Sequence, residues 1–200
     1  MPLNVPNLLT WLRIIMIPLV IGVYYAPDTW LSGWQQNLIA TILFIAAAIT
    51  DWLDGYLARR LNQTSAFGAF LDPVADKLMI AAALIVLVWL QRADAIIAVV
   101  IIGREIAVSA MREWMAKIGQ SKSVAVNFLG KVKTISQMIA VPMLLYHDTI
   151  GVFNVQRIGT WLIYCAAILT LVSMFNYLQR ALAPRAPGDR RRIDRRGTGP

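Results

Sequence analysis

The apolar run ATILFIAAAIT (residues 40–50) leads directly into the polar stretch DWLDGYLARR (residues 51–60). The reverse order follows, since the polar stretch GAFLDPVADK (residues 68–77) leads into the apolar run LMIAAALIVLVW (residues 78–89). A helix of about 20 apolar residues crosses a bilayer, and we expect spans over residues 36–60 and 72–91. The sequence therefore predicts a helical hairpin that carries its polar residues at one membrane surface.

The rest of the chain has the same apolar character. Of its 200 residues, 58% are hydrophobic and 15% are charged, whereas soluble domains have about 25% charged residues. Backbone groups in lipid must be satisfied within the protein, which favours helices. We therefore predict an all-α polytopic membrane helix bundle, one domain over residues 1–183. Its six spans are expected at residues 8–26, 36–60, 72–91, 94–116, 125–146 and 156–180.

The net charge of +8 is distributed unevenly. Residues 184–200 are rich in arginine, proline and glycine and contain no aromatic residue, so we expect a disordered tail. Topology and attraction to anionic headgroups explain this tail more simply than nucleic-acid binding does. Basic residues also gather near the linkers 61–71 and 117–124. The positive-inside rule then places both termini and the polar hairpin on the cytoplasmic side.

Four aspartates dominate the hairpin. On a helix, Asp51, Asp54, Gly55 and Ala58 lie within a face about 100° wide. Gly68, Asp72 and Asp76 are spaced four residues apart and form a second stripe, provided that this segment is helical. Pro73 leaves that condition open, because proline favours the first helical turn, with Asp72 as a possible N-cap.

Four carboxylates so close together cannot all stay ionised without cations. Oxygen ligands suit Mg²⁺, Mn²⁺ or Ca²⁺, and two such cations can hold a diphosphate. We therefore predict a divalent metal site. The alternative is ion pairing with Arg59, Lys77 or Arg104, which explains four regularly spaced acids less well. Small residues beside the acids leave room for a ligand, although close helix packing is their alternative explanation.

Basic and polar side chains also lie within the other predicted spans. Converging cations beside a metal site indicate capture of a second, anionic substrate. The alternative is ion pairing inside the bundle, or side chains that reach the headgroups. In the first, fourth and fifth spans these residues are Asn7, Thr10, Arg13, Arg104, Glu105, Arg112, Lys131 and Lys133.

The aspartate frame resembles the signature of the CDP-alcohol phosphotransferase family. It reads D-x-x-D-G-x-x-A-R from Asp51 and G-x-x-x-D-x-x-x-D from Gly68. The segments PNLLT-x-x-R (residues 6–13), GREI (103–106), AMREW (110–114) and GKVKT (130–134) resemble a bacterial branch of this family that forms phosphatidylglycerophosphate. The resemblance covers residues 4 to 180.

The resemblance implies an enzyme that transfers the phosphatidyl group of CDP-diacylglycerol to sn-glycerol 3-phosphate and releases CMP. It implies two divalent cations, Mg²⁺ or Mn²⁺, bound by Asp51, Asp54 and Asp72 and bordered by Asp76, which acts as the base. It also implies a homodimer in the bacterial inner membrane. The implied CDP-binding residues are Gly55, Ala58, Arg59 and Gly68, and the acceptor phosphate is assigned to Thr10, Arg104, Arg112, Lys131 and Lys133.

Three alternatives stay open. Another member of the same family would use inositol phosphate, serine or another alcohol as acceptor. An intramembrane prenyltransferase also uses paired aspartate motifs and magnesium, but those enzymes have more spans and lack the glycine framing. A divalent-cation transporter would place its ligands near the middle of the bilayer rather than at one end.

Overall fold

The computed structural model describes residues 5–60, 66–117 and 128–182. All regular elements in these ranges are helices, apart from one isolated bridge between Ile150 and Phe153. This confirms the predicted all-α fold with six long helices. They are α1 (Val5–Gly22), α2 (Gly33–Arg60), α3 (Ala66–Trp89), α4 (Ala95–Lys117), α5 (Phe128–Tyr146) and α6 (Val155–Leu182), with a short 3-10 helix, η1 (Val23–Tyr25), after α1.

Helix α3 begins six residues earlier than predicted. It starts at Ala66, so Pro73 lies inside the helix and Asp72 is not its N-cap. Proline removes only one backbone hydrogen bond, and the ring of Pro73 is exposed, so it does not obstruct packing against the neighbouring helices. The segment from Gly68 to Asp76 is therefore helical, and Gly68, Asp72 and Asp76 share one stripe as the spacing requires.

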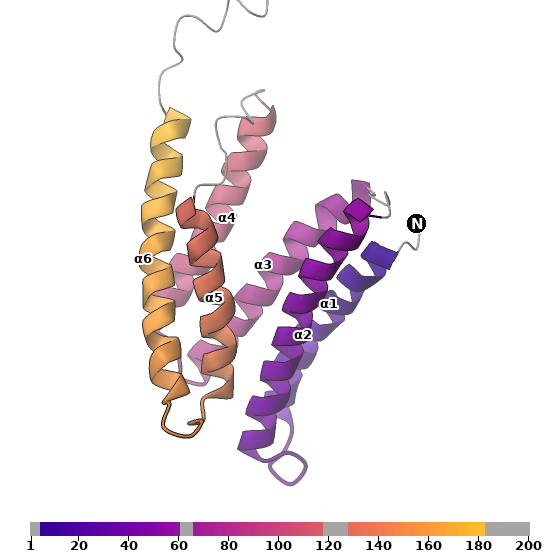
Figure 1. The fold of residues 1–200 in the computed structure, drawn as a ribbon, viewed down its shortest axis with the longest axis vertical. Coiled ribbons are helices and arrows are strands. Elements are labelled where there is room, and N and C mark those ends of the chain that lie inside the picture. Colours follow the sequence, from indigo (N-terminus) through magenta and orange to yellow (C-terminus); the bar gives the residue numbers. More distant parts are fainter. Residues whose placement is uncertain (1–4, 61–65, 118–127, 183–200) are drawn as a thin grey trace, which may run out of the picture.

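The helices form two groups, α1–α3 and α4–α6 (Figure 1). The groups approach each other at the end that carries the loops 26–32, 90–94 and 147–154, which we call the narrow end. They diverge toward the opposite end, where α1 begins and α6 ends, which we call the wide end. Helix α1 packs on α2 and α3, α5 packs on α6, and α2 packs on α5.

Apolar and polar side chains are buried at different levels of the bundle. The apolar core includes Phe44, Leu84, Leu87 and Leu144, which lie in the halves of their helices nearer the narrow end. In a lipid environment such side chains stabilise the bundle through close van der Waals packing rather than through removal from water. The buried charged residues lie nearer the wide end, together with apolar residues such as Val108 and Met115 of α4. The buried polar and charged residues at this level include Thr10, Arg13, Asp54, Arg104, Lys133 and Ser173. Most of the apolar core thus lies toward the narrow end, whereas the buried charges lie nearer the wide end.

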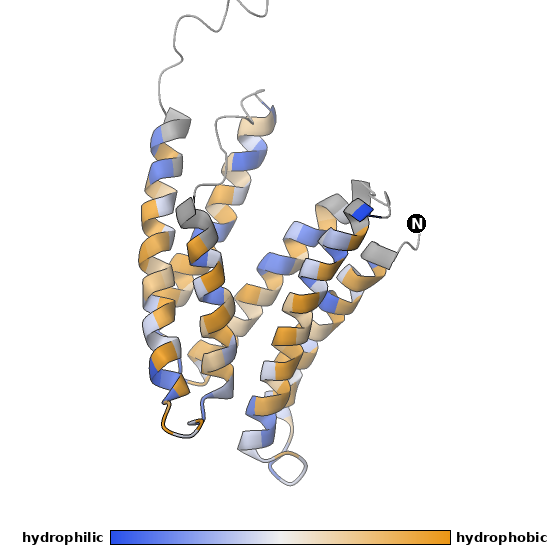
Figure 2. Ribbon diagram, viewed as in Figure 1, coloured by the Kyte–Doolittle hydropathy of each residue, from blue (hydrophilic) through white to orange (hydrophobic). Residues whose placement is uncertain are grey.

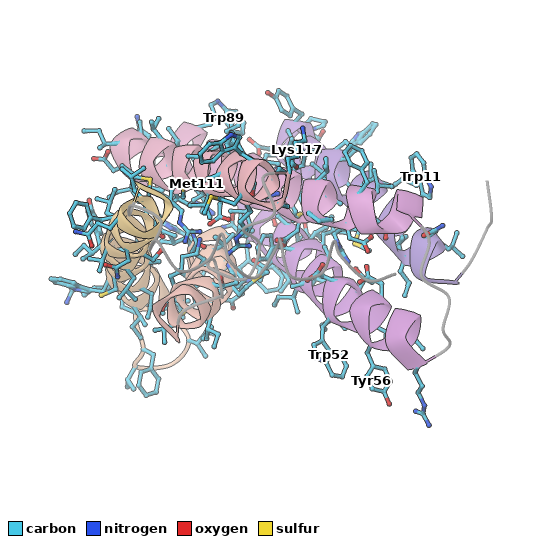
Figure 3. The ribbon with its side chains drawn as sticks, turned by 90° about the horizontal axis from the view of Figure 1, so that it is seen from above. Trp11, Trp52, Tyr56, Trp89, Met111 and Lys117 are labelled. Atoms are coloured by element: carbon cyan, nitrogen blue, oxygen red, sulfur yellow. The ribbon has the colours of Figure 1, made fainter. Side chains whose placement is uncertain are left out.

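The outer surface suits a lipid environment. Figure 2 shows apolar residues along the middle of the helices, with hydrophilic residues interrupting α3 and α4. Trp11, Trp52 and Trp89 point away from the bundle (Figure 3) and are exposed. By length and composition, three helical stretches in the described part can cross a membrane: Asn7–Tyr25, Gly33–Leu57 and Val155–Asn176. Helices α3 and α4 carry more charged residues than these stretches, and several of those residues build the site described next.

Candidate active site

A buried arginine on α1 joins the two acids of α2. Arg13 is 1% exposed, and its NH1 lies 2.7 Å from the Asp51 carboxylate, while its NH2 donates to Asp54. Asp54 is itself buried, whereas the side chain of Asp51 is 38% exposed. A buried carboxylate needs such a partner, because an unpaired charge in an apolar interior is very unfavourable. The partner of Asp51 and Asp54 is thus Arg13, which the sequence did not indicate, and not one of the predicted candidates Arg59, Lys77 and Arg104.

Helix α1 also contacts the acids of α3. The hydroxyl of Thr10 donates a hydrogen bond to Asp72, and Thr10 is fully buried. Thr10 and Arg13 are three residues apart, so they project from one face of α1, as their spacing predicts. Asn7 precedes them by one more turn and is also buried. The polar stripe of the first span therefore faces the aspartate frame, and Thr10 lies beside Asp72 rather than in the basic cavity described below.

The donor chemistry fits divalent cations, since Asp51, Asp54, Asp72 and Asp76 supply only hard carboxylate oxygens. In the arrangement described here, however, the Arg13 guanidinium pairs with Asp51 and Asp54. Among the described residues, no three acidic, histidine or cysteine side chains group closely enough to hold a metal ion. Arg13 thus supplies the positive charge that the two α2 carboxylates require.

Asp76 lies where two kinds of cavity meet. On one side, a small cavity is lined by Arg13, Asp51 and Asp76 together with apolar residues of α2, α3 and α5. On the other side, a cavity of about 270 Å³ is lined by Asp76 and by basic residues of α3, α4 and α5. The basic residues of this second cavity, hereafter the basic cavity, are Lys77, Arg104, Arg112 and Lys133. One carboxylate therefore faces both the aspartate frame and a cationic pocket.

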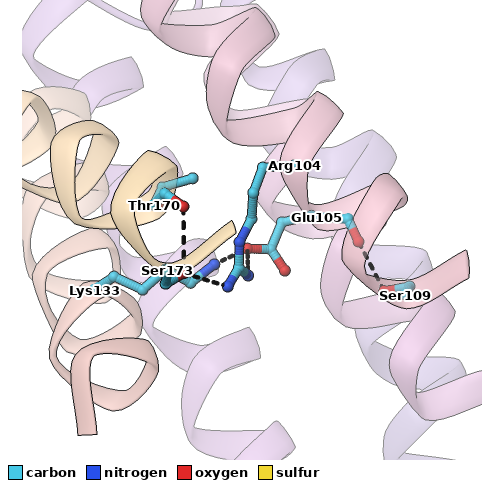
Figure 4. A network of polar contacts seen from close by, with 6 residues as sticks. All are labelled: Arg104, Glu105, Ser109, Lys133, Thr170 and Ser173. Carbon is cyan, nitrogen blue, oxygen red and sulfur yellow. Dashed lines mark hydrogen bonds and ion pairs between the residues drawn. The ribbon is translucent and has the colours of Figure 1, made fainter. Parts of the chain in front are cut away.

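The basic cavity is held together by a network between α4, α5 and α6 (Figure 4). The Glu105 carboxylate forms ion pairs with Lys133 and with Arg104, whose NH1 lies 3.1 Å from Oε1 of Glu105. Arg104 also donates to the hydroxyl of Ser173 at 2.6 Å. Three of the five residues assigned to the acceptor phosphate, Arg104, Arg112 and Lys133, line this one cavity. From the sequence, Glu105 was expected only to hold an arginine in place, and Ser173 on the distant helix α6 was not predicted.

The predicted CDP-binding residues are described in part. A Cβ atom added to Gly55 would meet no heavy atom within 4 Å among the described residues, so Gly55 is not needed there for close helix packing. Gly68 is buried on α3. The side chains of Ala58, Arg59 and Lys131 lie outside the part of the chain that the structure describes. Open space beside Gly55 agrees with room for a ligand next to Asp51 and Asp54.

An apolar groove leads to the aspartate frame from the outside of the bundle. It has a volume of about 400 Å³ and is lined mainly by apolar side chains of α2, with Met138 of α5 and with Asp51 at one edge. Trp52 also lines the groove and stacks on Tyr56, with ring centroids 5.9 Å apart. A chain of lipid-like shape and polarity can lie along this surface with its polar end near Asp51.

Comparison with known proteins agrees with this geometry. The family described as CDP-alcohol phosphatidyltransferase matches residues 3–172. Proteins of Shigella flexneri serotype 5b and Escherichia coli K12, both named CDP-diacylglycerol--glycerol-3-phosphate 3-phosphatidyltransferase, are 46% identical to the chain over 189 residues. The alignment covers 92% of this chain and 97% of each relative. The chain belongs to the CDP-alcohol phosphatidyltransferase family.

Proposed function

We propose that the protein is a membrane enzyme that transfers a phosphatidyl group from CDP-diacylglycerol to sn-glycerol 3-phosphate. The products are phosphatidylglycerophosphate and CMP. The observation that carries this proposal is the position of Asp76, which lines both the cavity with Arg13 and Asp51 and the basic cavity. The two relatives' names, at 46% identity over nearly the full chain, support the same donor and acceptor.

The donor is assigned to the side of the bundle formed by α1, α2 and α3. The apolar groove beside Asp51 matches the acyl part of a lipid, and the open space at Gly55 suits the nucleotide. Lipid can enter this groove from the bilayer, because Trp52 and Tyr56 on the same helix face are exposed. The diphosphate would then lie beside the aspartates, at the level where the helices carry their polar groups.

Divalent cations complete the donor site. The family generally depends on them, and we assign Mg²⁺ or Mn²⁺ to Asp51, Asp54 and Asp72, with Asp76 at the border. When bound, the cations offset the negative charge of the diphosphate in both the substrate and the transition state. Arg13 is positioned to maintain the α2 carboxylates as a pair, since it contacts both of them.

The acceptor is assigned to the basic cavity. Arg104, Arg112 and Lys133 supply charge-assisted donors for a phosphate group, and the arginine fork suits phosphate oxygens. An uncharged acceptor such as serine would leave these cations without a matching anion. The acceptor alcohol would then extend from its phosphate toward Asp76, which lines the same cavity.

The reaction requires one base and one leaving group. The 1-hydroxyl oxygen of sn-glycerol 3-phosphate attacks the phosphorus atom next to diacylglycerol, and its proton passes to the Asp76 carboxylate. The bond from that phosphorus to the bridging oxygen breaks, and CMP leaves with the electron pair. A positioned carboxylate in this role accelerates proton transfer by about 100- to 10,000-fold.

The proposal is tested with purified protein, CDP-diacylglycerol and a panel of acceptors comprising glycerol 3-phosphate, inositol phosphate and serine. CMP release is followed with Mg²⁺, with Mn²⁺ and with EDTA. We expect turnover only with glycerol 3-phosphate and only with a divalent cation. Faster turnover with another alcohol would reassign the acceptor, whereas turnover in EDTA would overturn the metal assignment.

Topology and assembly belong to the same proposal. We infer a multi-pass bacterial inner-membrane protein with both termini and the aspartates on the cytoplasmic side. Helices α1 and α6 begin and end, respectively, at the wide end, which supports termini on one side (Figure 1). The predicted arginine-rich tail, residues 184–200, lies outside the described residues. Reporter fusions at both termini test the topology, and light scattering in detergent tests the expected homodimer.

A further inference from the structure

Glu105 lies at the centre of the cationic residues of the basic cavity. A single carboxylate oxygen, Oε1, contacts Lys133 of α5 and lies 3.1 Å from NH1 of Arg104 (Figure 4). Lys133 and Arg104 are both buried, with side chains 4% exposed. The side chains of Lys133 and Arg104 therefore converge on one oxygen atom of Glu105, the residue that follows Arg104 on α4.

Glu105 is more accessible than the cations it joins. Its side chain is 26% exposed, and it lines the basic cavity together with Asp76. A molecule in this cavity therefore meets the Glu105 carboxylate on the way to Arg104 and Lys133. Phosphate oxygens accept the same charge-assisted hydrogen bonds as a carboxylate does, so both compete for the same donors.

Arg104 is held by a second contact that does not involve Glu105. Its NH2 donates to the Ser173 hydroxyl at 2.6 Å, and Ser173 in turn donates to the backbone carbonyl of Thr170 at 3.2 Å. The Arg104 guanidinium therefore keeps its hydrogen bond to Ser173 of α6 when Glu105 moves. Arg104 would remain available to an incoming anion.

We propose that Glu105 is a displaceable counter-ion that occupies the place of the acceptor's phosphate when the cavity is empty. The inference rests on the proposed function for the identity of the acceptor, but not for the existence of an anion site. Glu105 keeps two buried cations paired, and an acceptor must bring enough negative charge to replace it. Glu105 is thus a specificity-determining residue that favours a phosphorylated alcohol over a neutral one.

The decisive variant is Glu105→Gln, which preserves shape but removes the charge that competes with phosphate. Binding of inorganic phosphate and of glycerol 3-phosphate is measured by calorimetry on the full chain in detergent, without lipid donor. We expect both Kd values to fall by about tenfold or more, because charge competition within a few ångströms is strong in a partly buried site. If Glu105 only positions the cations, the Glu105→Gln substitution should instead raise both Kd values, because the cations would lose their alignment.

Glu113→Gln is the matched control, because Glu113 is an exposed acid on the same helix and does not line the basic cavity. It removes the same charge and should leave both Kd values unchanged. Unchanged or weaker phosphate binding by Glu105→Gln overturns the inference, as does equal tightening by Glu113→Gln. Wild-type protein that binds no phosphate overturns it as well.

Thermal unfolding provides a second readout and covers the case in which the variant is unstable. Glu105→Gln leaves Lys133 without its carboxylate, so we expect a lower Tm in phosphate-free buffer. Added phosphate should raise this Tm by more than it raises that of wild-type protein, and an equal increase contradicts the inference. If Glu105→Gln binds inorganic phosphate more tightly than wild-type protein but neither protein binds glycerol 3-phosphate, the proposed acceptor is wrong while the role of Glu105 stands.

Discussion

The two ends of the bundle use arginine in different ways. At the narrow end, Arg92 donates to the backbone carbonyl of Leu145 at 2.7 Å and to the side-chain oxygen of Asn37 at 2.8 Å. At the wide end, Arg13 and Arg104 contact carboxylates of Asp51, Asp54 and Glu105. The last backbone carbonyls of a helix have no hydrogen-bond partner within that helix, so Arg92 satisfies them. A carboxylate paired with an arginine can instead give up that arginine for another cation. The first arrangement closes the bundle, and the second leaves partners that a ligand can replace.

The packing around these arginines follows the same division. The apolar core lies toward the narrow end, where the loops 26–32, 90–94 and 147–154 bring the helices together. The basic cavity and the aspartate frame lie beyond it, toward the wide end. Stability and chemistry are therefore separated along the helix axes. Substitutions at the two ends should affect different measurements.

Replacing the expected base has the largest predicted effect. Asp76→Asn removes the proton acceptor, so CMP release should fall by about 100-fold or more while binding of CDP-diacylglycerol is retained. The matched control at the narrow end is Asp94→Asn, because Asp94 caps α4 through the backbone N–H of Ile96 and asparagine caps equally well. Wild-type turnover by Asp76→Asn would remove Asp76 as the base.

The basic cavity should respond through acceptor binding alone. Arg112→Ala removes a cation that lines this cavity, so the KM for glycerol 3-phosphate should rise by about tenfold or more, with little change for the lipid donor. Arg157→Ala removes an exposed arginine at the narrow end and should change neither value. A larger effect on the KM for CDP-diacylglycerol would contradict the assignment of this cavity.

Replacing Arg92 at the narrow end should lower the stability of the protein and leave substrate binding unchanged. Arg92→Met removes the hydrogen bonds to Leu145 and Asn37 and leaves those acceptors unpaired, which should cost about 1–3 kcal/mol of unfolding free energy. Thermal unfolding in detergent measures this loss, and the KM values should remain those of wild-type protein. A changed acceptor KM at unchanged Tm would break the proposed separation between the two ends.

Substitutions of two glycines should separate helix packing from ligand binding, with smaller effects on Tm and KM than the substitutions above. A Cβ at Gly159 on α6 would lie 3.1 Å from Leu144 and Met143 on α5, so Gly159→Ala should destabilise the bundle by about 1 kcal/mol or more. A Cβ at Gly55 meets open space, so Gly55→Ala should keep the Tm and raise the KM for CDP-diacylglycerol a few-fold. A lower Tm for Gly55→Ala, with unchanged KM, would favour the helix-packing explanation of Gly55.

The sequence predicted the helices well because their signals are local. Apolar runs and polar linkers placed all six helices to within about six residues at each end, and the start of α3 differed most because Pro73 did not begin the helix. The aspartate spacing identified the family and the faces of α2 and α3. The spacing of Asn7, Thr10 and Arg13 gave α1 a polar face but did not indicate what that face contacts.

The sequence by itself determined a six-helix membrane bundle, its acidic frame and its family, because hydrophobic length and residue spacing act within single segments. Tertiary structure decided which charges meet. Arg13 and Asp54 are 41 positions apart, and Arg104 and Ser173 are 69 apart. Such pairs depend on which helix faces pack together, which no local pattern specifies. The same packing placed Asp76 between two cavities and Glu105 between two cations.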